Sequence, residues 1–162
     1  MGVYSIDKIV SEARRLAREY RQATGKTLPI TTEIAINDAI RLLGLTPSDR
    51  GEQGFDATMS YRGEDIRVQI KGRVIFDEKR AGYRLGQVKT GQPWDAILLV
   101  IMNEEFESNE IYLANRADIL DVIEQGKNKR GALSIARFKA IGELLWTAAN
   151  GLEDDGYWTN AG

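Results

Sequence analysis

The chain has 162 residues, 43% of them hydrophobic and 28% charged, which is typical of one soluble globular domain with a single core. It contains no cysteine and no histidine, which excludes disulfides, thiolate chemistry, histidine-based catalysis and the common zinc sites. The remaining ligands are mainly oxygen atoms, which suit Mg²⁺, Mn²⁺ or Ca²⁺. Because the formal charge is −2, a polyanionic partner would have to be held by a local basic surface rather than by net charge.

The first 45 residues predict two helices. In residues 5–24 apolar side chains recur at helical spacing behind Ser5, a suitable N-cap, and we expect the opposite face to be solvated rather than to track DNA. That opposite face carries Arg14, Arg15, Arg18 and Arg21. A second helix is expected over about 32–43, ended by Gly44, with Glu33 in its first turn.

Residues 46–54 are rich in turn formers, and the segment after them predicts an antiparallel hairpin. Apolar and polar residues alternate from Phe55 to Tyr61 and again from Ile66 to Lys71, on either side of a short turn over 62–64. Residues opposite each other in such a pair share a face. Two registers keep the apolar residues together: one places Asp56 opposite Lys71, and the other places Asp56 opposite Gln69. In both, these three polar side chains cluster on one face near the open end of the hairpin.

The second half predicts a sheet covered by helices. Trp94–Met102 is a continuous apolar run of strand length, typical of a central strand, and Glu110–Ala114 indicates a neighbouring strand. Asn115, with Asp118 three residues later, can cap a helix that ends near Gly126. We expect a last helix from Ser134 to about Asn150, and Trp94, Phe138 and Trp146 in the core. The chain is then one α/β domain with an N-terminal helix over 5–24, a core over about 30–150 and an acidic tail over 152–162.

The stretch GFDATMSYRGEDIRVQIKGR resembles the core motif of the PD-(D/E)XK nuclease superfamily. In that pattern an aspartate begins one strand, a turn follows, and an acid-x-lysine lies in the next strand. Asp56 takes the place of the aspartate, Gln69 that of the acid and Lys71 that of the lysine, while Glu33 matches a glutamate that the preceding helix often supplies. The resemblance covers about 30–145 in the order of elements. It implies a restriction-endonuclease-like core with a mixed sheet, and a metal-dependent nuclease, commonly a homodimer, of the kind found in restriction or defence.

These residue types suit phosphodiester cleavage. Asp56, the side-chain oxygen of Gln69 and the carbonyl of Ile70 could hold Mg²⁺ or Mn²⁺, and Glu33 could be a further ligand or a helix residue favoured by the dipole alone. Lys71 could orient the nucleophile or stabilise developing negative charge. Gln69 departs from the motif, because a neutral amide attracts a cation less than a carboxylate does.

Several basic residues are candidates to contact nucleic acid, expected to be DNA. They are Arg67, Arg73, Arg84, Lys127, Lys129, Arg130 and Arg137. Two alternatives stay open: a nucleic-acid-binding module of the same fold that has lost catalysis, and a protein-interaction subunit. We expect a cytoplasmic protein without a membrane segment, because the apolar run over 96–102 is far too short to cross a bilayer and the first residues lack a signal-peptide pattern.

Overall fold

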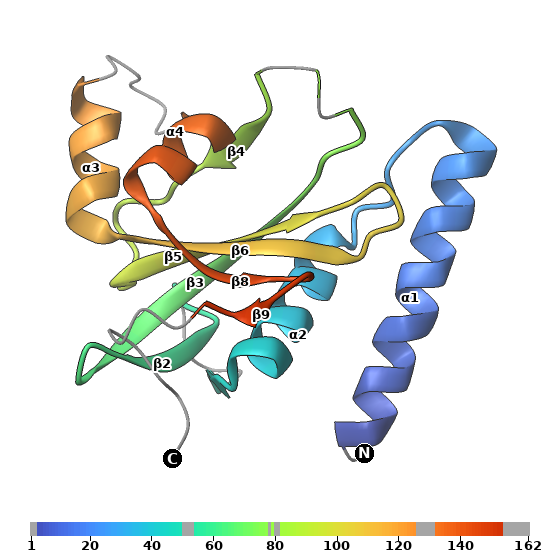
Figure 1. Ribbon diagram of the computed structural model, residues 1–162, viewed down its shortest axis with the longest axis horizontal. Coiled ribbons are helices and arrows are strands. Elements are labelled where there is room, and N and C mark those ends of the chain that lie inside the picture. Colours follow the sequence, from blue (N-terminus) through green and yellow to red (C-terminus); the bar gives the residue numbers. More distant parts are fainter. Residues whose placement is uncertain (1–2, 50–53, 78, 80–81, 126–131, 154–162) are drawn as a thin grey trace.

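The computed structural model describes residues 3–49, 54–77, 79, 82–125 and 132–153. It is an α/β structure with a seven-stranded mixed sheet in the order β1-β2-β3-β5-β6-β8-β9, a separate two-stranded sheet of β4 and β7, and helices on both faces (Figure 1). The elements are α1 (Val3–Thr24), α2 (Thr31–Leu43), β1 (Thr46–Pro47), β2 (Ala57–Tyr61), β3 (Glu64–Val74), β4 (Arg84–Gln87), β5 (Ala96–Met102), β6 (Ser108–Asn115), α3 (Arg116–Gln125), β7 (Ala132–Ser134), α4 (Ile135–Ile141), β8 (Glu143–Thr147) and β9 (Gly151–Leu152).

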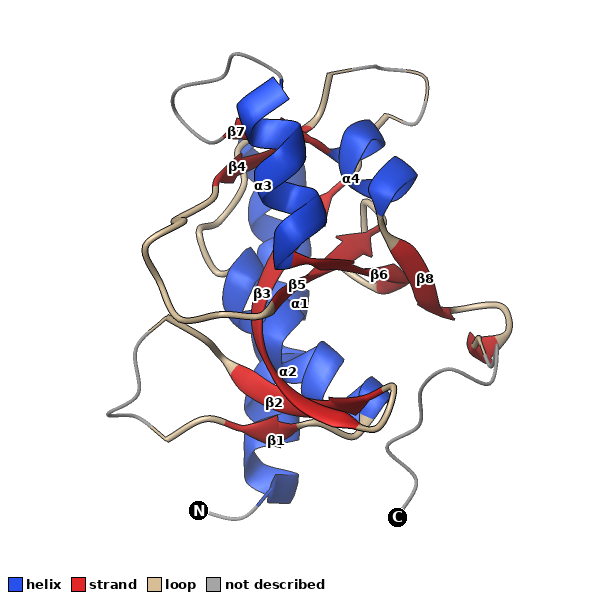
Figure 2. Ribbon diagram, turned by 90° about the vertical axis from the view of Figure 1, so that its left-hand side faces the viewer, coloured by secondary structure: helices blue, strands red, loops and turns tan. Residues whose placement is uncertain are grey.

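The predicted central strand is confirmed. All seven residues of β5 are buried, and β5 pairs in parallel with β3 and antiparallel with β6. Its alternate side chains enter two separate apolar clusters, one under α2 and one under α3 and α4. A strand buried on both faces requires a continuous apolar sequence, and the run over 96–102 supplies one. Figure 2 shows the sheet strongly curled, with β1 and β2 lying well apart from β8.

The predicted hairpin is also confirmed, with a two-residue turn at Arg62 and Gly63. Both residues have positive φ, 52° and 81°, as a tight turn that matches the strand twist requires. Tyr61 pairs with Glu64, and Ala57 pairs with Val68. This is the second of the two registers that alternation allows. The second helix ends as expected at Gly44, whose φ of 68° and ψ of 40° lie in the left-handed region.

One close approach fixes α2 on the sheet. A Cβ on Gly72 of β3 would lie 2.5 Å from the Cβ of Ala35 and 3.2 Å from the carbonyl oxygen of Thr31. Only glycine therefore lets the start of α2 come this near to β3. As a result, α2 covers the face of β3 on which Val68 and Ile70 lie.

The prediction of a long last helix is wrong. Residues 135–141 form the seven-residue α4, capped by Ser134, whose Oγ accepts from the backbone N–H of Arg137. The chain then becomes extended at Gly142, and residues 143–147 form β8, paired with the outer edge of β6. That edge would otherwise expose unpaired backbone groups, and β8 satisfies them. Residues 143–147 are therefore strand because they complete the edge of the sheet, although their spacing predicts a helix.

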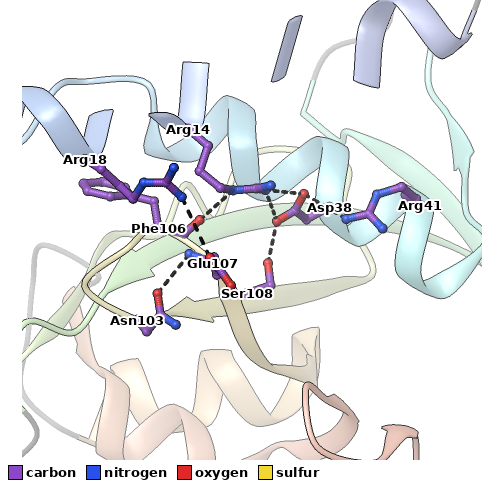
Figure 3. A network of polar contacts seen from close by, with 8 residues as sticks. All are labelled: Arg14, Arg18, Asp38, Arg41, Asn103, Phe106, Glu107 and Ser108. Carbon is purple, nitrogen blue, oxygen red and sulfur yellow. Dashed lines mark hydrogen bonds and ion pairs between the residues drawn. The ribbon is translucent and has the colours of Figure 1, made fainter. Parts of the chain in front are cut away.

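The predicted orientation of α1 is also wrong in part. The helix already begins at Val3, so Ser5 is not its N-cap, and its large apolar side chains at positions 6, 9, 16 and 20 are exposed. Arg14 instead points inward: its guanidinium donates to both carboxylate oxygens of Asp38, at 2.6 and 2.7 Å, and to the Phe106 carbonyl, at 2.9 Å (Figure 3). Asp38 is buried in α2 and needs a cation, which draws the arginine side of α1 toward the body.

The cap of α3, the three tryptophan and phenylalanine side chains expected in the core and the loop over 46–54 are the remaining predictions. Asn115 and Asp118 form the predicted cap of α3, because the Asp118 N–H donates to the Asn115 side-chain oxygen at 2.9 Å and the two side chains are also bonded at 3.1 Å. Trp94 and Phe138 are buried, whereas Trp146 is half-buried against the cluster under α2. Part of the loop predicted over 46–54 is the short strand β1. None of the described helices combines the length and the apolar character that crossing a bilayer requires.

Candidate functional site

The register of the hairpin places Asp56, Gln69 and Lys71 on one face. Ala57 is opposite Val68, so Asp56, one residue before β2, is opposite Gln69, one residue further along β3. The Asp56 N–H donates to the Val68 carbonyl at 2.8 Å, which extends the ladder by that residue. Gln69 and Lys71 alternate with the buried Val68 and Ile70, and therefore point away from α2.

The Asp56 carboxylate is held at the end of this ladder. Its Oδ2 accepts a hydrogen bond from the Ile70 N–H at 2.7 Å. Burial raises the pKa of Asp56, while the Ile70 N–H and the charge of Lys71 act in the opposite direction. The charged form of Asp56 is therefore destabilised by burial, and a bound cation would stabilise it.

Backbone direction adds a third oxygen to this group. Val68 directs its carbonyl toward the β2 side, whereas the Arg67 carbonyl accepts from Asp95 at the start of the β5 side. Groups alternate along a strand, so the N–H and carbonyl of Ile70 both face the β2 side. The N–H meets the Asp56 side chain, because β2 begins only at Ala57. The Ile70 carbonyl thus faces the same side as the Asp56 carboxylate.

Gln69 contributes an acceptor without a donor. Its Oε1 is buried and has no hydrogen-bond partner, the one such side-chain atom among the residues that the structure describes. Buried polar atoms in folded proteins almost always have a partner, so an exception needs an explanation. An amide oxygen beside a carboxylate and a backbone carbonyl is the ligand type that Mg²⁺ or Mn²⁺ prefers.

Lys71 completes the face. Its Nζ donates to the Gln87 carbonyl at 3.2 Å. Burial lowers the pKa of Lys71, the charges of Arg73 and Lys89 lower it further, and Asp56 opposes them. A carboxyl with a raised pKa beside a lysine with a lowered pKa is a combination typical of functional sites.

Asp56, Gln69 and Ile70 offer oxygen atoms of the type that bind divalent cations, with only one formal negative charge among them. In the described part of the chain no group of three or more acidic, histidine or cysteine residues gathers closely enough to hold a metal. Coulomb's law then predicts weaker cation binding than at a site with two carboxylates.

Glu33 is not joined to this group. It is exposed in the first turn of α2, and that helix packs through Ile34 and Ala35 on the other face of the sheet. Among the described residues, no hydrogen bond or ion pair connects Glu33 with Asp56, Gln69 or Lys71.

The predicted basic contacts fall into three groups. Arg67 is near the site, where its Nε lies 3.1 Å from the Asp95 carboxylate and its guanidinium 6.0 Å from the centre of the Phe55 ring. Arg73 is bound instead to backbone carbonyls of Gly72, Arg84 and Leu85, which ties β3 to β4. The remaining residues are Arg84 and Arg137, which are exposed, and Lys127, Lys129 and Arg130, which lie outside the described residues.

Lys89 and the Gln87 carbonyl are the site components that no sequence pattern located. Gln87 is the last residue of β4 and Lys89 follows two residues later, so both belong to a part of the chain that reaches β3 from the second sheet. Motif spacing within the hairpin carries no information about a strand from another sheet.

A separate cavity of about 810 Å³ lies beyond the end of β3 and is lined by Ile75, Phe76, Met102 and Ile135 among others. Its charged residues include Lys139 and Glu110, which pair with each other at 3.3 Å. The cavity therefore has mostly apolar walls, and its further charged residue is the carboxylate Glu104. The carboxylate with a raised pKa, the lysine with a lowered pKa and the unpartnered amide oxygen lie instead at Asp56, Lys71 and Gln69.

Compared with models of known protein families and with curated protein sequences, the chain matches none of them. What this site can do follows from the chemistry of its own residues.

Proposed function

We propose that the protein is a metal-dependent endonuclease that hydrolyses phosphodiester bonds in DNA, built on a restriction-endonuclease-like core. The observation that carries the proposal is the buried, partnerless Oε1 of Gln69 on the same face as Asp56 and Lys71. Support also comes from the order of elements, in which a helix, a hairpin and a buried parallel strand follow one another.

The Asp56 carboxylate, the Gln69 Oε1 and the Ile70 carbonyl would hold Mg²⁺ or Mn²⁺. When bound, such an ion polarises the scissile phosphate and lowers the pKa of the attacking water. Glu33 would serve as a more distant ligand only after a movement toward the site, since it is exposed on α2.

Lys71 would act through its charge. In the absence of substrate its ammonium group donates to the Gln87 carbonyl, 3.2 Å away. A bound phosphate offers a negatively charged acceptor instead, and the ammonium would stabilise the charge that develops on its oxygens. Arg67, on the same face and half-exposed, would contact the backbone of the nucleic acid.

Two copies would be needed to cut both strands of a duplex in one encounter, and we propose a homodimer acting in restriction or defence. The basic residues Arg84 and Arg137, together with Lys127, Lys129 and Arg130, are the proposed outer contacts with DNA. No part of this assembly requires a basic protein overall, because the contacts are local.

Plasmid cleavage in the presence of Mg²⁺ or Mn²⁺ tests the proposal. We expect Asp56→Ala and Lys71→Ala each to lower the rate at least about 100-fold, as the loss of a group that stabilises transition-state charge does. The matched controls are Asp121→Ala and Lys8→Ala, which remove exposed residues of the same types from helices. Cleavage that survives both site substitutions would end the assignment.

A binding module without catalysis is the second candidate, favoured by the single carboxylate at the site. It predicts DNA retention without metal, and no cutting by either the wild type or Gln69→Glu. Cutting that strengthens in Gln69→Glu would instead support the endonuclease, because a second carboxylate increases attraction for the cation.

A further inference from the structure

The segment from Gln87 to Trp94 runs alongside the proposed site. Lys71 reaches it through the hydrogen bond to the Gln87 carbonyl. Val88, the next residue, is buried, while Gln87 and Lys89 on either side of it are exposed. Lys89 is therefore presented to solvent two residues from the group that Lys71 contacts.

Side chains from the core hold the backbone of this segment in place through hydrogen bonds. The buried Trp94 donates from its indole Nε1 to the Lys89 carbonyl at 2.9 Å, and the Gln92 N–H donates to the same oxygen at 3.3 Å. The backbone under Lys89 is thus fixed by a residue of the core.

Arg116, at the start of α3, also contacts this segment. Its guanidinium lies 4.4 Å from the centre of the Trp94 ring. It also donates to the carbonyls of Thr90, Gln92 and Trp94, with Nη1 at 2.7 Å from the last two. Because all three acceptors belong to the segment, Arg116 restricts its movement.

The charges around the site do not balance. Lys89 has no ion pair with any residue in the described ranges, and it is near enough to Lys71 for its charge to lower the pKa of that lysine. Arg73 has the same effect on Lys71 and is itself committed to backbone carbonyls. Among the described residues, Asp56 is the carboxylate whose charge opposes this lowering. An excess of positive charge here, in a protein of net charge −2, favours a bound anion.

We propose that Lys89 binds a phosphate of the nucleic-acid backbone next to the one that is cleaved, with Trp94 and Arg116 as its positioning residues. This assignment rests on the proposed function, since it takes the polyanion at the Asp56 face to be nucleic acid. The hydrogen bonds from Trp94 and Arg116 hold the backbone around Lys89 in place before a ligand arrives.

Binding of a short fluorescein-labelled DNA duplex, measured by fluorescence anisotropy in EDTA over a series of salt concentrations, tests the proposal. We expect Lys89→Gln to weaken binding about tenfold, the loss of one charge-assisted hydrogen bond. It should also reduce the slope of log K against log salt by about one. The matched control is Lys26→Gln, an exposed lysine in the α1–α2 connection, which should change neither quantity.

The positioning role makes a separate prediction. Arg116→Gln should weaken DNA binding in the wild-type background and have no further effect in the Lys89→Gln background, because both changes remove one contact. Additive effects would overturn the role of Arg116.

The cleavage assay keeps the two proposals distinguishable. In one outcome, Lys89→Gln leaves the DNA affinity and the salt slope unchanged while cleavage still depends on Asp56. That result would overturn the role of Lys89 and leave the endonuclease in place. A wild-type chain that binds no DNA would overturn both.

Discussion

Asp38 is buried and Asp56 is half-buried, and the surroundings of the two carboxylates differ. Asp38 on α2 is 1% exposed and is surrounded by donors: two from Arg14, one from Ser108 at 2.6 Å and one from Arg41 at 3.4 Å (Figure 3). Asp56 at the hairpin accepts one backbone N–H at 2.7 Å, beside an amide oxygen that has no donor.

The difference separates a structural cluster from a candidate site. Around Asp38 the acceptors and donors match, so nothing further is needed and the cluster joins α1, α2 and the β5–β6 turn. Around Asp56 the acceptors exceed the donors, and the nearby cations, Lys71 and Lys89, are turned toward a carbonyl or toward solvent. Buried polar groups without hydrogen-bond partners are typical of sites that bind a ligand.

The largest expected effect is the loss of stability when the Asp38 cluster is disrupted. Asp38→Ala should lower the free energy of unfolding by about 3–5 kcal/mol, because it leaves the largely buried Arg14 charge uncompensated. Urea denaturation measures the loss, and Asp121→Ala, an exposed aspartate on α3, should stay within about 0.5 kcal/mol of the wild type. A loss for Asp38→Ala as small as that of the control would mean that the cluster is not what holds α1.

At Gln69, whose Oε1 has no hydrogen-bond partner, we expect a substitution to raise the free energy of unfolding instead of lowering it. Gln69→Leu removes an acceptor that has no partner, so without metal the free energy of unfolding should rise by about 1 kcal/mol. Adding Mg²⁺ should raise the thermal midpoint of the wild type but not that of Gln69→Leu. Gln22→Leu, at an exposed position of α1, is the control for the change of residue type. Equal stabilisation of the wild type and Gln69→Leu by Mg²⁺ would remove Gln69 from the metal site.

The smallest effect concerns pH. Because burial raises the pKa of Asp56 in the folded state, its ionised form costs stability above that pKa, and the cost disappears as the pH falls through it. Asp56→Asn should therefore be slightly more stable than the wild type at neutral pH, and the two should converge in acid. Urea midpoints measured across the acidic range would show this convergence.

Asp95→Asn is the matched control, with the opposite sign. Arg67 lowers the pKa of Asp95, so the Asp95 charge stabilises the fold above the pKa of the unfolded chain, and this contribution is lost as the pH falls. The substitution should be slightly destabilising at neutral pH and neutral in acid, by a small amount because the pair is well exposed. A destabilised Asp56→Asn at neutral pH would contradict the comparison.

Local pattern predicted the elements wherever one interaction dominated. The alternation around Met59 and Ile66 predicted the hairpin, and the unbroken apolar run over 96–102 predicted the central strand, since burial alone explains both. Residues 143–147 were predicted as helix and form a strand, because the free edge of β6 outweighs a weak local preference. The arginine side of α1 turned inward because its partner, Asp38, lies 24 residues away in the sequence.

The sequence by itself determined that Asp56, Gln69 and Lys71 share a face, because side chains in strands alternate with a period of two and no permitted register separates them. Only the tertiary structure decided which register was adopted, that the Gln69 oxygen lacks a donor, that Glu33 is exposed on a helix of the other face and that Lys89 comes near Lys71. These depend on where strands and helices distant in the chain meet, and periodicity within one segment carries no information about the neighbour it will find.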